Sequence, residues 1–213
     1  MILLSNVKPD PIFDGGKANS SNIWASECVF EKGKHYLITA PSGKGKSTLL
    51  HLIYGLRNDY SGKIAINEQA ISNFKPDDWS ALRQQKLSIV FQDLRLFPNL
   101  SALENIELKN DLSAHKSKEE IIAMAEKLGV SDLLNKPCNT LSYGQRQRIA
   151  IIRSLCQPFD FLLLDEPFSH LDDDNIDIAS SLILKEVEEQ KAAMLLVSLG
   201  EPFNYSYDRE LLL

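Results

Sequence analysis

The sequence predicts an α/β fold with a mostly parallel β-sheet, and two observations support this fold class. Short apolar runs with the length of buried strands alternate with segments of helical periodicity. The alternation stops between residues 92 and 156, where helical segments occur without a convincing strand. The chain has 213 residues, which suits one large domain. We therefore predict a single domain, 1–213, in which 1–91 and 157–213 form the core and 92–156 form a helical insertion.

The predicted strands fall into two groups. Two early runs, at 2–7 and 23–31, flank a loop rich in Gly, Asn and Ser at 14–22, and they predict a small amino-terminal antiparallel β lobe. Six further runs predict the largely parallel sheet. These six runs span 36–40, 63–66, 87–91, 161–165, 193–198 and 210–213.

The clearest predicted helices span 47–57, 118–128, 143–156 and 175–190. The helix at 118–128 has a well-defined start, because Ser117 and Glu120 have the spacing of a capping box. Gly129 follows it and suits the left-handed conformation that ends many helices. Helices between strands place the parallel sheet inside the molecule.

Composition excludes several classes of protein. Lys and Arg total 23 and Asp and Glu total 29, a formal net charge of −6, which disfavours nucleic acid as the main partner. The three cysteines, Cys28, Cys138 and Cys156, are odd in number and lack metal-ligand spacing, so we expect buried free thiols. No run approaches the length of an apolar membrane span, and the first residues lack the pattern of a secretory signal. We therefore expect a cytoplasmic or peripheral protein.

A glycine-rich loop joins the predicted strand at 36–40 to the predicted helix at 47–57. It reads Ala40-Pro41-Ser42-Gly43-Lys44-Gly45-Lys46-Ser47-Thr48. Glycines let the backbone curl so that several N–H groups point at a phosphate beside the positive end of a helix. We expect Ser42 to Thr48 to bind the phosphates of a nucleotide, with Lys46 at the β- and γ-phosphates and Ser47 at Mg²⁺. The alternative, a chance Gly-Lys-Ser turn, is disfavoured by the strand before the loop and the helix after it, so a P-loop NTPase core is predicted.

The strand at 161–165 ends in two acidic residues, Asp165 and Glu166. The carboxyl edge of a parallel sheet is where α/β folds hold their ligands. Next to a P-loop this run is typical of a Walker B strand, in which Asp165 holds Mg²⁺ and Glu166 accepts a proton from the attacking water. The alternative is a solvated strand end that happens to carry two acids.

The run Leu141-Ser142-Tyr143-Gly144-Gln145 matches four of the five positions of the signature Leu-Ser-Gly-Gly-Gln. Together with the P-loop and the Walker B strand, it makes nearly the whole chain resemble the nucleotide-binding subunit of ABC transporters. The stretch from Phe91 to Ile106 resembles the lipoprotein-releasing, macrolide-export and cell-division branch. The resemblance implies that two subunits, identical or paralogous, enclose two ATP molecules, with Ser142 and Gly144 of one chain at the γ-phosphate held by the other. It also implies a separate transmembrane permease, which would place the chain on the cytoplasmic face of a membrane.

The resemblance assigns further site residues. Gln92 resembles the Q-loop glutamine, which contacts Mg²⁺ or the attacking water, and Asp172 falls in a run similar to the D-loop at the dimer interface. An aromatic side chain usually stacks on adenine in this family, and Phe13 and Trp24 are the two candidates, Phe13 having the better spacing. His170, beside Asp172, is interpreted as a surface histidine.

Two positions depart from the family pattern. Leu199 stands where a switch histidine is expected after the strand at 193–198, and leucine offers no hydrogen bond to a phosphate. Tyr143 replaces a glycine of the signature, and we expect its ring to point away, because the contacts involve the Ser142 hydroxyl and the Gly144 N–H. Hydrolysis is therefore predicted to be slow or partner-dependent.

Three functions follow from these motifs. The first is an ATP-hydrolysing subunit that couples dimer closure to a membrane partner near Gln92 and the helical insertion. The second is a clamp that closes on ATP with little turnover because of Leu199. The third, a DNA-repair type of ABC ATPase, is disfavoured by the negative charge and the lack of a long coiled-coil insertion.

Overall fold

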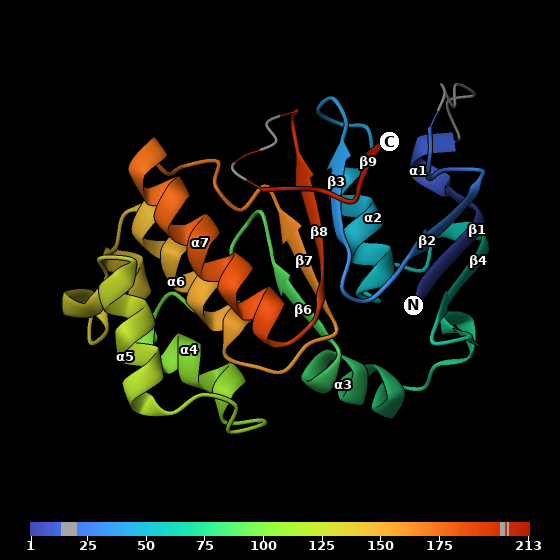
Figure 1. The fold of residues 1–213 in the computed structure, drawn as a ribbon. Coiled ribbons are helices and arrows are strands. Elements are labelled where there is room, and N and C mark those ends of the chain that lie inside the picture. The colour runs from blue at the N-terminus through green and yellow to red at the C-terminus, as the bar shows by residue number, and fades with distance from the viewer. Residues whose placement is uncertain (14–20, 201–202, 204) are drawn as a thin grey trace.

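The computed structural model describes residues 1–13, 21–200, 203 and 205–213, without the side chains of residues 11 and 13. It contains two β-sheets with helices between and beside them (Figure 1). The five-stranded sheet has the order β6-β7-β8-β3-β9, and the four-stranded sheet has the order β2-β1-β4-β5. All pairs in the first are parallel and all in the second antiparallel. The predicted fold class, a parallel core with an antiparallel amino-terminal lobe, is confirmed.

The strands have the following bounds. The parallel sheet contains β3 (His35–Thr39), β6 (Leu87–Val90), β7 (Phe161–Asp165), β8 (Ala193–Ser198) and β9 (Arg209–Leu212). The antiparallel sheet contains β1 (Ile2–Pro9), β2 (Glu27–Phe30), β4 (Tyr60–Ile66) and β5 (Gln69–Ala70).

The helices have the following bounds. The α-helices are α1 (Asp10–Phe13), α2 (Lys46–Ile53), α3 (Pro76–Gln85), α4 (Ala102–Asn110), α5 (Lys118–Lys127), α6 (Tyr143–Leu155) and α7 (Asp173–Glu189). Short 3₁₀ turns occur at Ile71–Asn73, Ser131–Leu133 and Cys138–Thr140. The predicted capping box of α5 is present, because Ser117 Oγ accepts from the Glu120 N–H at 3.2 Å and the Glu120 carboxylate accepts from the Ser117 N–H at 2.8 Å.

Alternate residues of each central strand contribute to two different cores. In β7, Phe161 and Leu163 pack with α2 and the antiparallel sheet, whereas Leu162 and Leu164 pack with α6 and α7. This follows from the two-residue period of a strand, and it explains why these strands are apolar throughout. Figure 1 shows α2 on one side of the parallel sheet and α6 and α7 on the other. The strands β3, β6, β7 and β8 are thereby buried on both faces, whereas the edge strand β9 is largely exposed, and the ends of the strands are left for a site.

Two strand predictions were wrong in detail. The run at 63–66 belongs to β4, which pairs with β1 in the antiparallel sheet rather than with the parallel strands; an apolar run does not reveal which strand it will pair with. The predicted strand at 23–31 is reduced to Glu27–Phe30. Its first residues form a turn instead, in which the Ser21 hydroxyl accepts from the N–H groups of Ile23 and Trp24. Most of the predicted loop at 14–22 lies outside the described residues.

The three cysteines are as predicted. Cys28, Cys138 and Cys156 are buried free thiols, and burial raises the pKa of Cys28 to about 11. Within the described part of the chain, no helix combines the length and apolar content needed to cross a membrane. Helix α3 was not predicted, because Leu82 is its one buried residue and its sequence therefore has little periodicity.

Candidate nucleotide-binding site

The loop between β3 and α2 forms an open turn in which Ser42 and Lys44 are exposed. Gly43 and Gly45 have positive φ angles of 77° and 95°. At Gly45 an added Cβ would lie 2.2 Å from Cδ1 of Ile12, so the end of that side chain would have to shift, but it is the positive φ that favours glycine here. No described side chain caps the start of α2, and a helix start of this kind favours an anion. The loop therefore has the conformation and the donors of a phosphate site.

Lys46 joins this loop to the end of β7. Its side chain is buried, and its Nζ donates to the carbonyl oxygens of Ala40 at 3.0 Å and Pro41 at 3.4 Å. Nζ also forms an ion pair with Oε1 of Glu166 at 3.3 Å. These contacts hold the ammonium beside the loop and beside the carboxylate that the sequence analysis assigned as a base.

Gln92 brings the remaining side chains into the same network. Its Oε1 accepts from the Ser47 hydroxyl at 3.5 Å, and its Nε2 donates to Oε2 of Glu166 at 3.3 Å. Glu166 itself has a left-handed backbone, with φ of 48°, and its N–H donates to the Val197 carbonyl at 3.1 Å. Four predicted site residues, Lys46, Ser47, Gln92 and Glu166, thus meet in one chain although they come from three parts of the sequence.

Asp165 is the unusual member of the group. It is 1% exposed, and neither of its carboxylate oxygens has a hydrogen-bond partner of good geometry among the described residues, although the Ser47 hydroxyl lies close enough to lower its pKa. Burial raises the pKa of Asp165 to about 6, and the nearby Glu166 charge adds to the rise, while Ser47 and Lys46 oppose it. A buried carboxylate without partners is costly unless a cation approaches it.

The residues around Asp165 fit Mg²⁺. No group of three His, Cys, Asp or Glu residues that could hold a metal occurs in the described ranges. Mg²⁺ does not require one, since it is commonly held by one or two protein oxygens together with water and phosphate. Asp165, the Ser47 hydroxyl and the Gln92 amide oxygen supply oxygen ligands of that kind.

The signature run begins α6. The Ser142 hydroxyl accepts from the Gln145 N–H at 3.2 Å, and Oε1 of Gln145 accepts from the Ser142 N–H at 2.9 Å, which is the capping box that the sequence predicts. Gly144 packs closely against the D-loop, because an added Cβ would lie 2.8 Å from the His170 carbonyl oxygen. The Tyr143 ring lies against the His170 ring, with centroids 4.0 Å apart. Glycine at 144 is therefore required by packing within the chain, independently of any ligand.

Asp172 caps α7. One oxygen of its carboxylate accepts from the backbone N–H of Asn175 at 2.9 Å and from its side-chain amide at 2.7 Å, and these bonds lower the pKa of Asp172. In the described part of the chain, no hydrogen bond or ion pair joins Ser142, Gly144 or Asp172 to the P-loop. Within one chain, contacts join Lys46, Ser47, Gln92 and Glu166, the first set of predicted residues. Ser142, Gly144 and Asp172, the second set, form no hydrogen bond with them in the described part of the chain.

Of the two candidates for adenine stacking, Trp24 has a described side chain and Phe13 does not. Phe13 is the last residue of α1, and its side chain lies outside the described residues. Trp24 is 5% exposed and lies behind Gly45, 3.5 Å from the position of an added Cβ. A ring buried in this way presents no free face to a base.

Leu199 and Gln147 complete the surroundings. Leu199 is 63% exposed, directly after β8, and lines a hollow of about 360 Å³ together with Glu166 and Ser169.

Gln147 was missed by the sequence analysis. Its buried amide donates to the Glu166 carbonyl and the Ser169 hydroxyl, both at 3.4 Å, and accepts from the His170 N–H at 3.2 Å. A polar residue on the apolar face of a predicted helix was the available signal.

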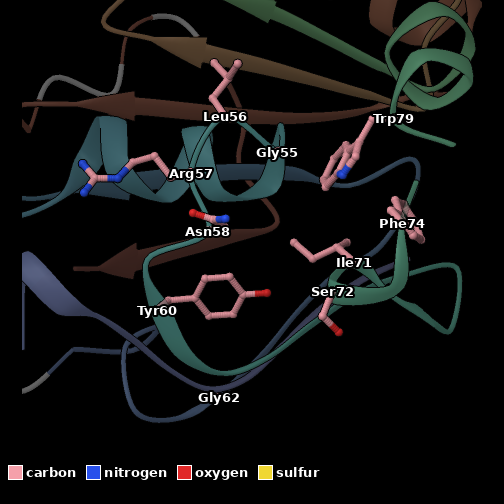
Figure 2. A pocket seen from close by; sticks show the side chains of 10 residues that line it. All are labelled: Gly55, Leu56, Arg57, Asn58, Tyr60, Gly62, Ile71, Ser72, Phe74 and Trp79. Atoms are coloured by element: carbon pink, nitrogen blue, oxygen red, sulfur yellow. The ribbon is translucent and has the colours of Figure 1, made fainter. Parts of the chain in front are cut away.

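A separate pocket lies at the carboxyl end of α2 (Figure 2). It measures about 540 Å³, and Tyr60, Phe74 and Trp79 form part of its wall. Arg57, which also lines it, is already paired with Asp59. Trp79 packs against Gly55, where an added Cβ would lie 2.4 Å from the ring. Arg57 and Trp79 are thus engaged in structural contacts. We therefore assign the candidate nucleotide site to the ends of β3 and β7 and not to this pocket.

This fold and site define a class of protein, and comparison with known proteins agrees. The model of the ABC transporter family matches residues 26–169. The chain belongs to the ABC transporter family and is an ATP-binding cassette, that is, an ABC-type ATPase.

Individual relatives indicate the branch of the family that this chain resembles. It is 35% identical over 170 residues to the lipoprotein-releasing system ATP-binding protein LolD of Saccharophagus degradans, covering 78% of this chain and 74% of the relative. It is 40% identical over 171 residues to the thiamine import ATP-binding protein ThiQ of Aliivibrio fischeri, covering 79% and 70%. The predicted resemblance to the lipoprotein-releasing branch is confirmed.

A solved cassette has the same fold. The dimeric structure of MJ0796, a bacterial ABC transporter cassette, matches with a TM-score of 0.85 at 28% identity, covering 100% of this chain and 94% of that one. A dimeric post-hydrolysis state of the same cassette, bound to ADP and Pi, matches with a TM-score of 0.78 at 28% identity, covering 99% and 96%.

Proposed function

We propose that the chain is the ATP-hydrolysing subunit of an ABC transporter or a related envelope complex, and that two such subunits close around two Mg-ATP molecules to drive a separate membrane partner. The observation that carries this proposal is the network of Lys46, Ser47, Gln92 and Glu166 around the unpaired, buried carboxylate of Asp165. A buried carboxylate with a purely structural role would have hydrogen-bond partners within the chain, as most buried polar groups do.

Each residue of the network has a role that its contacts support. The N–H groups of the loop from Ser42 to Thr48 and the Lys46 ammonium would hold the phosphates of ATP. Ser47, Asp165 and Gln92 would hold Mg²⁺, which when bound neutralises charge on phosphate oxygens. Glu166, fixed by Lys46 and Gln92, would accept the proton of the attacking water.

The second set of residues would serve a neighbouring subunit. Ser142 and Gly144 lie at the start of α6, where backbone N–H groups favour a phosphate. Asp172 lies at the start of α7, close to the same surface through the contact of Gly144 with His170. We propose that all three face the nucleotide of a second copy or of a paralogous chain. The dimeric state of MJ0796 supports this arrangement.

The membrane partner would bind beside the Q-loop and α4, on the cytoplasmic face of the membrane. A pocket of about 320 Å³ lies there, and its rim carries Phe97, Leu108 and Leu112, which are 56%, 45% and 54% exposed. Lys109 and Arg153 also line it, and no described carboxylate forms an ion pair with either. Burial, with the charges of Arg153 and Arg83, lowers the pKa of Lys109 to about 8.

Neither cation has an ion pair among the described residues, although the Arg153 guanidinium donates to the carbonyl oxygens of Leu94 and Arg95. An apolar surface with such cations favours one kind of occupant. We propose an apolar segment of the partner that carries a carboxylate, because the carboxylate would compensate Lys109 and Arg153 while the apolar side chains cover the rim. The transported substance is not part of the proposal. Relatives named for lipoprotein release and for thiamine import are comparably similar to this chain.

The clamp is the second candidate, and Leu199 favours it. At the position of the family's switch histidine, this side chain offers no hydrogen bond to a phosphate. A cassette of this kind would bind ATP and close, and would turn over slowly.

Phosphate release by the purified chain tests the two candidates. It is measured at saturating Mg-ATP over a range of protein concentrations, with Glu166→Gln as the control. Turnover that rises more than linearly with protein and disappears in the control would support an active dimer. ATP binding without turnover would support the clamp or a requirement for the membrane partner, and absence of ATP binding would contradict both.

A further inference from the structure

Tyr143 makes a contact that the roles above do not explain. Its hydroxyl donates to the backbone carbonyl of Gln92 at 2.6 Å, across 51 positions of sequence. The Tyr143 ring is half-buried and packs against the His170 ring. The Arg146 guanidinium lies 5.3 Å from the centroid of the Tyr143 ring. The tyrosine thus joins three segments: the start of α6, the Q-loop and the D-loop.

The Gln92 end of this contact reaches the nucleotide site of the same chain. The Gln92 side chain bonds to Ser47 and Glu166, while its main-chain carbonyl bonds to Tyr143. A movement of Gln92 toward a bound nucleotide would therefore displace the acceptor of the Tyr143 hydroxyl. The hydrogen bond makes the position of Gln92 depend on the position of α6.

The other end of the contact reaches the signature run. Tyr143 is the first residue of α6 and lies between Ser142 and Gly144. The capping box between Ser142 and Gln145 makes this helix start a rigid unit. A displacement of Tyr143 would consequently move the Ser142 hydroxyl and the Gly144 N–H with it. In the proposed dimer these two groups face the other subunit's nucleotide.

We propose that Tyr143 is a positioning residue that couples the two nucleotide sites of the dimer, by transmitting the position of Gln92 at one site to the signature residues at the other. This inference rests on the proposed function, because it requires two sites. Coupling of this kind is a free energy shared between sites, and it is reciprocal. A second connection, from Gln147 to the Glu166 carbonyl and the His170 N–H, also joins α6 to this end of the sheet.

Tyr143→Phe separates this role from simple packing, because it keeps the ring against His170 and removes only the hydroxyl. The matched control is Tyr205→Phe, since the Tyr205 hydroxyl donates to the Ser180 carbonyl at 3.3 Å in the core, outside the proposed site. ATP hydrolysis is measured against ATP concentration for the wild type and both variants. We expect Tyr143→Phe to lower the maximal rate by about fivefold or more and to abolish cooperativity between sites, with little change in the ATP affinity of the isolated subunit. Tyr205→Phe should leave the cooperativity unchanged.

Amide hydrogen exchange supplies a readout that does not require turnover. It is recorded with and without Mg-ATP in a Glu166→Gln background. We expect nucleotide to slow exchange at 90–96 and also at 142–148 when Tyr143 is present, and only at 90–96 in the combined variant with Tyr143→Phe. Equal protection of both segments with and without the hydroxyl would overturn the coupling role, as would the same loss of cooperativity in Tyr205→Phe.

The two proposals fail in different ways. If the chain with Tyr143 intact shows neither turnover nor a nucleotide-dependent change in exchange, the proposed function and the coupling role are both overturned. If it responds to nucleotide and Tyr143→Phe responds identically, the coupling role alone is overturned.

Discussion

The end of β7 and the start of α6 both carry predicted nucleotide contacts, but their polar groups are occupied differently. At the end of β7, the Asp165 carboxylate is buried without a hydrogen-bond partner. At the start of α6, the hydroxyl of Ser142 and the amide oxygen of Gln145 each satisfy a backbone N–H of the other residue. The first region is electrostatically incomplete without a cation, whereas the second is stable as it stands. We infer that ligand binding completes the first region and that the second is a preformed surface for another subunit.

The largest expected effect is at the end of β7, where Glu166 lies. Glu166→Gln should lower ATP turnover by about 10²- to 10⁴-fold, because the amide cannot accept the proton of the attacking water. Binding should persist, since Lys46 and the loop N–H groups assigned to the phosphates are unchanged, and the one amide oxygen of glutamine can still accept from Lys46 or from Gln92. Phosphate release and equilibrium ATP binding are the measurements. Glu189→Gln, at an exposed carboxylate paired with Lys185 on α7, is the matched control and should be inert. A Glu166→Gln chain that keeps more than about a tenth of the turnover would contradict the role.

Restoring a polar group after β8 should have the next largest effect. If Leu199 limits hydrolysis, Leu199→His should raise turnover by about 10²-fold, the scale of one well-placed donor to a developing phosphate charge. Steady-state phosphate release checks this. Leu199→Ala removes the apolar side chain without adding a donor and should give no such gain. Equal rates in all three proteins would show that the missing histidine does not limit this cassette.

The hydroxyl of Ser142 allows the preformed surface to be tested against identical caps elsewhere. Ser142, Ser101 and Ser117 each accept from the N–H three residues on at 3.2 Å. Replacing any of them by Ala should lower the free energy of unfolding by about 0.5 to 2 kcal/mol, through loss of the cap. Only Ser142→Ala should also lower turnover, by about 10-fold or more, because a hydrogen bond to a charged group is lost. Denaturation and phosphate release are measured on Ser142→Ala and Ser117→Ala; a similar loss of turnover in both would reduce Ser142 to a helix cap.

The same contrast explains which features could be predicted from the sequence. The P-loop, the Walker B acids and the capping boxes are continuous runs whose local geometry follows from residue type and spacing, so Lys46, Ser47 and Asp165 could be named in advance. The pairing of β4 with β1 and the bond from Tyr143 to Gln92 depend on how distant segments pack. Gln147 acts through main-chain groups of the D-loop, which have no residue-type signature. Local chemistry could therefore be predicted, whereas the contacts that connect the motifs could not.

The smallest expected effect concerns stability, and it contrasts the two ends of β7. Asp165 has a pKa raised to about 6, against an ordinary value of 3.8. Between these values the folded state binds more protons than the unfolded state, so this group makes the free energy of unfolding fall as the pH rises. Without Mg²⁺ and nucleotide, Asp165→Asn should therefore stabilise the chain by about 1 to 3 kcal/mol at neutral pH, and by less and less as the pH falls toward 4.

Asp160, just before β7, is the matched control with the opposite sign. Burial alone would raise its pKa, but its bonds to Lys32 and Lys86 lower it. Its contribution to stability is thus present at neutral pH and is lost as the pH falls through its folded-state pKa, so Asp160→Asn should destabilise the chain at neutral pH. Urea denaturation between pH 4 and 8 measures both variants. Stabilisation by Asp165→Asn that is lost when Mg-ATP is added would show that the buried carboxylate is kept for its ligand, because only the wild-type chain would gain from the cation. Destabilisation by Asp165→Asn in the ligand-free chain would instead show that Asp165 is a structural residue, and that the two ends of β7 do not differ as proposed.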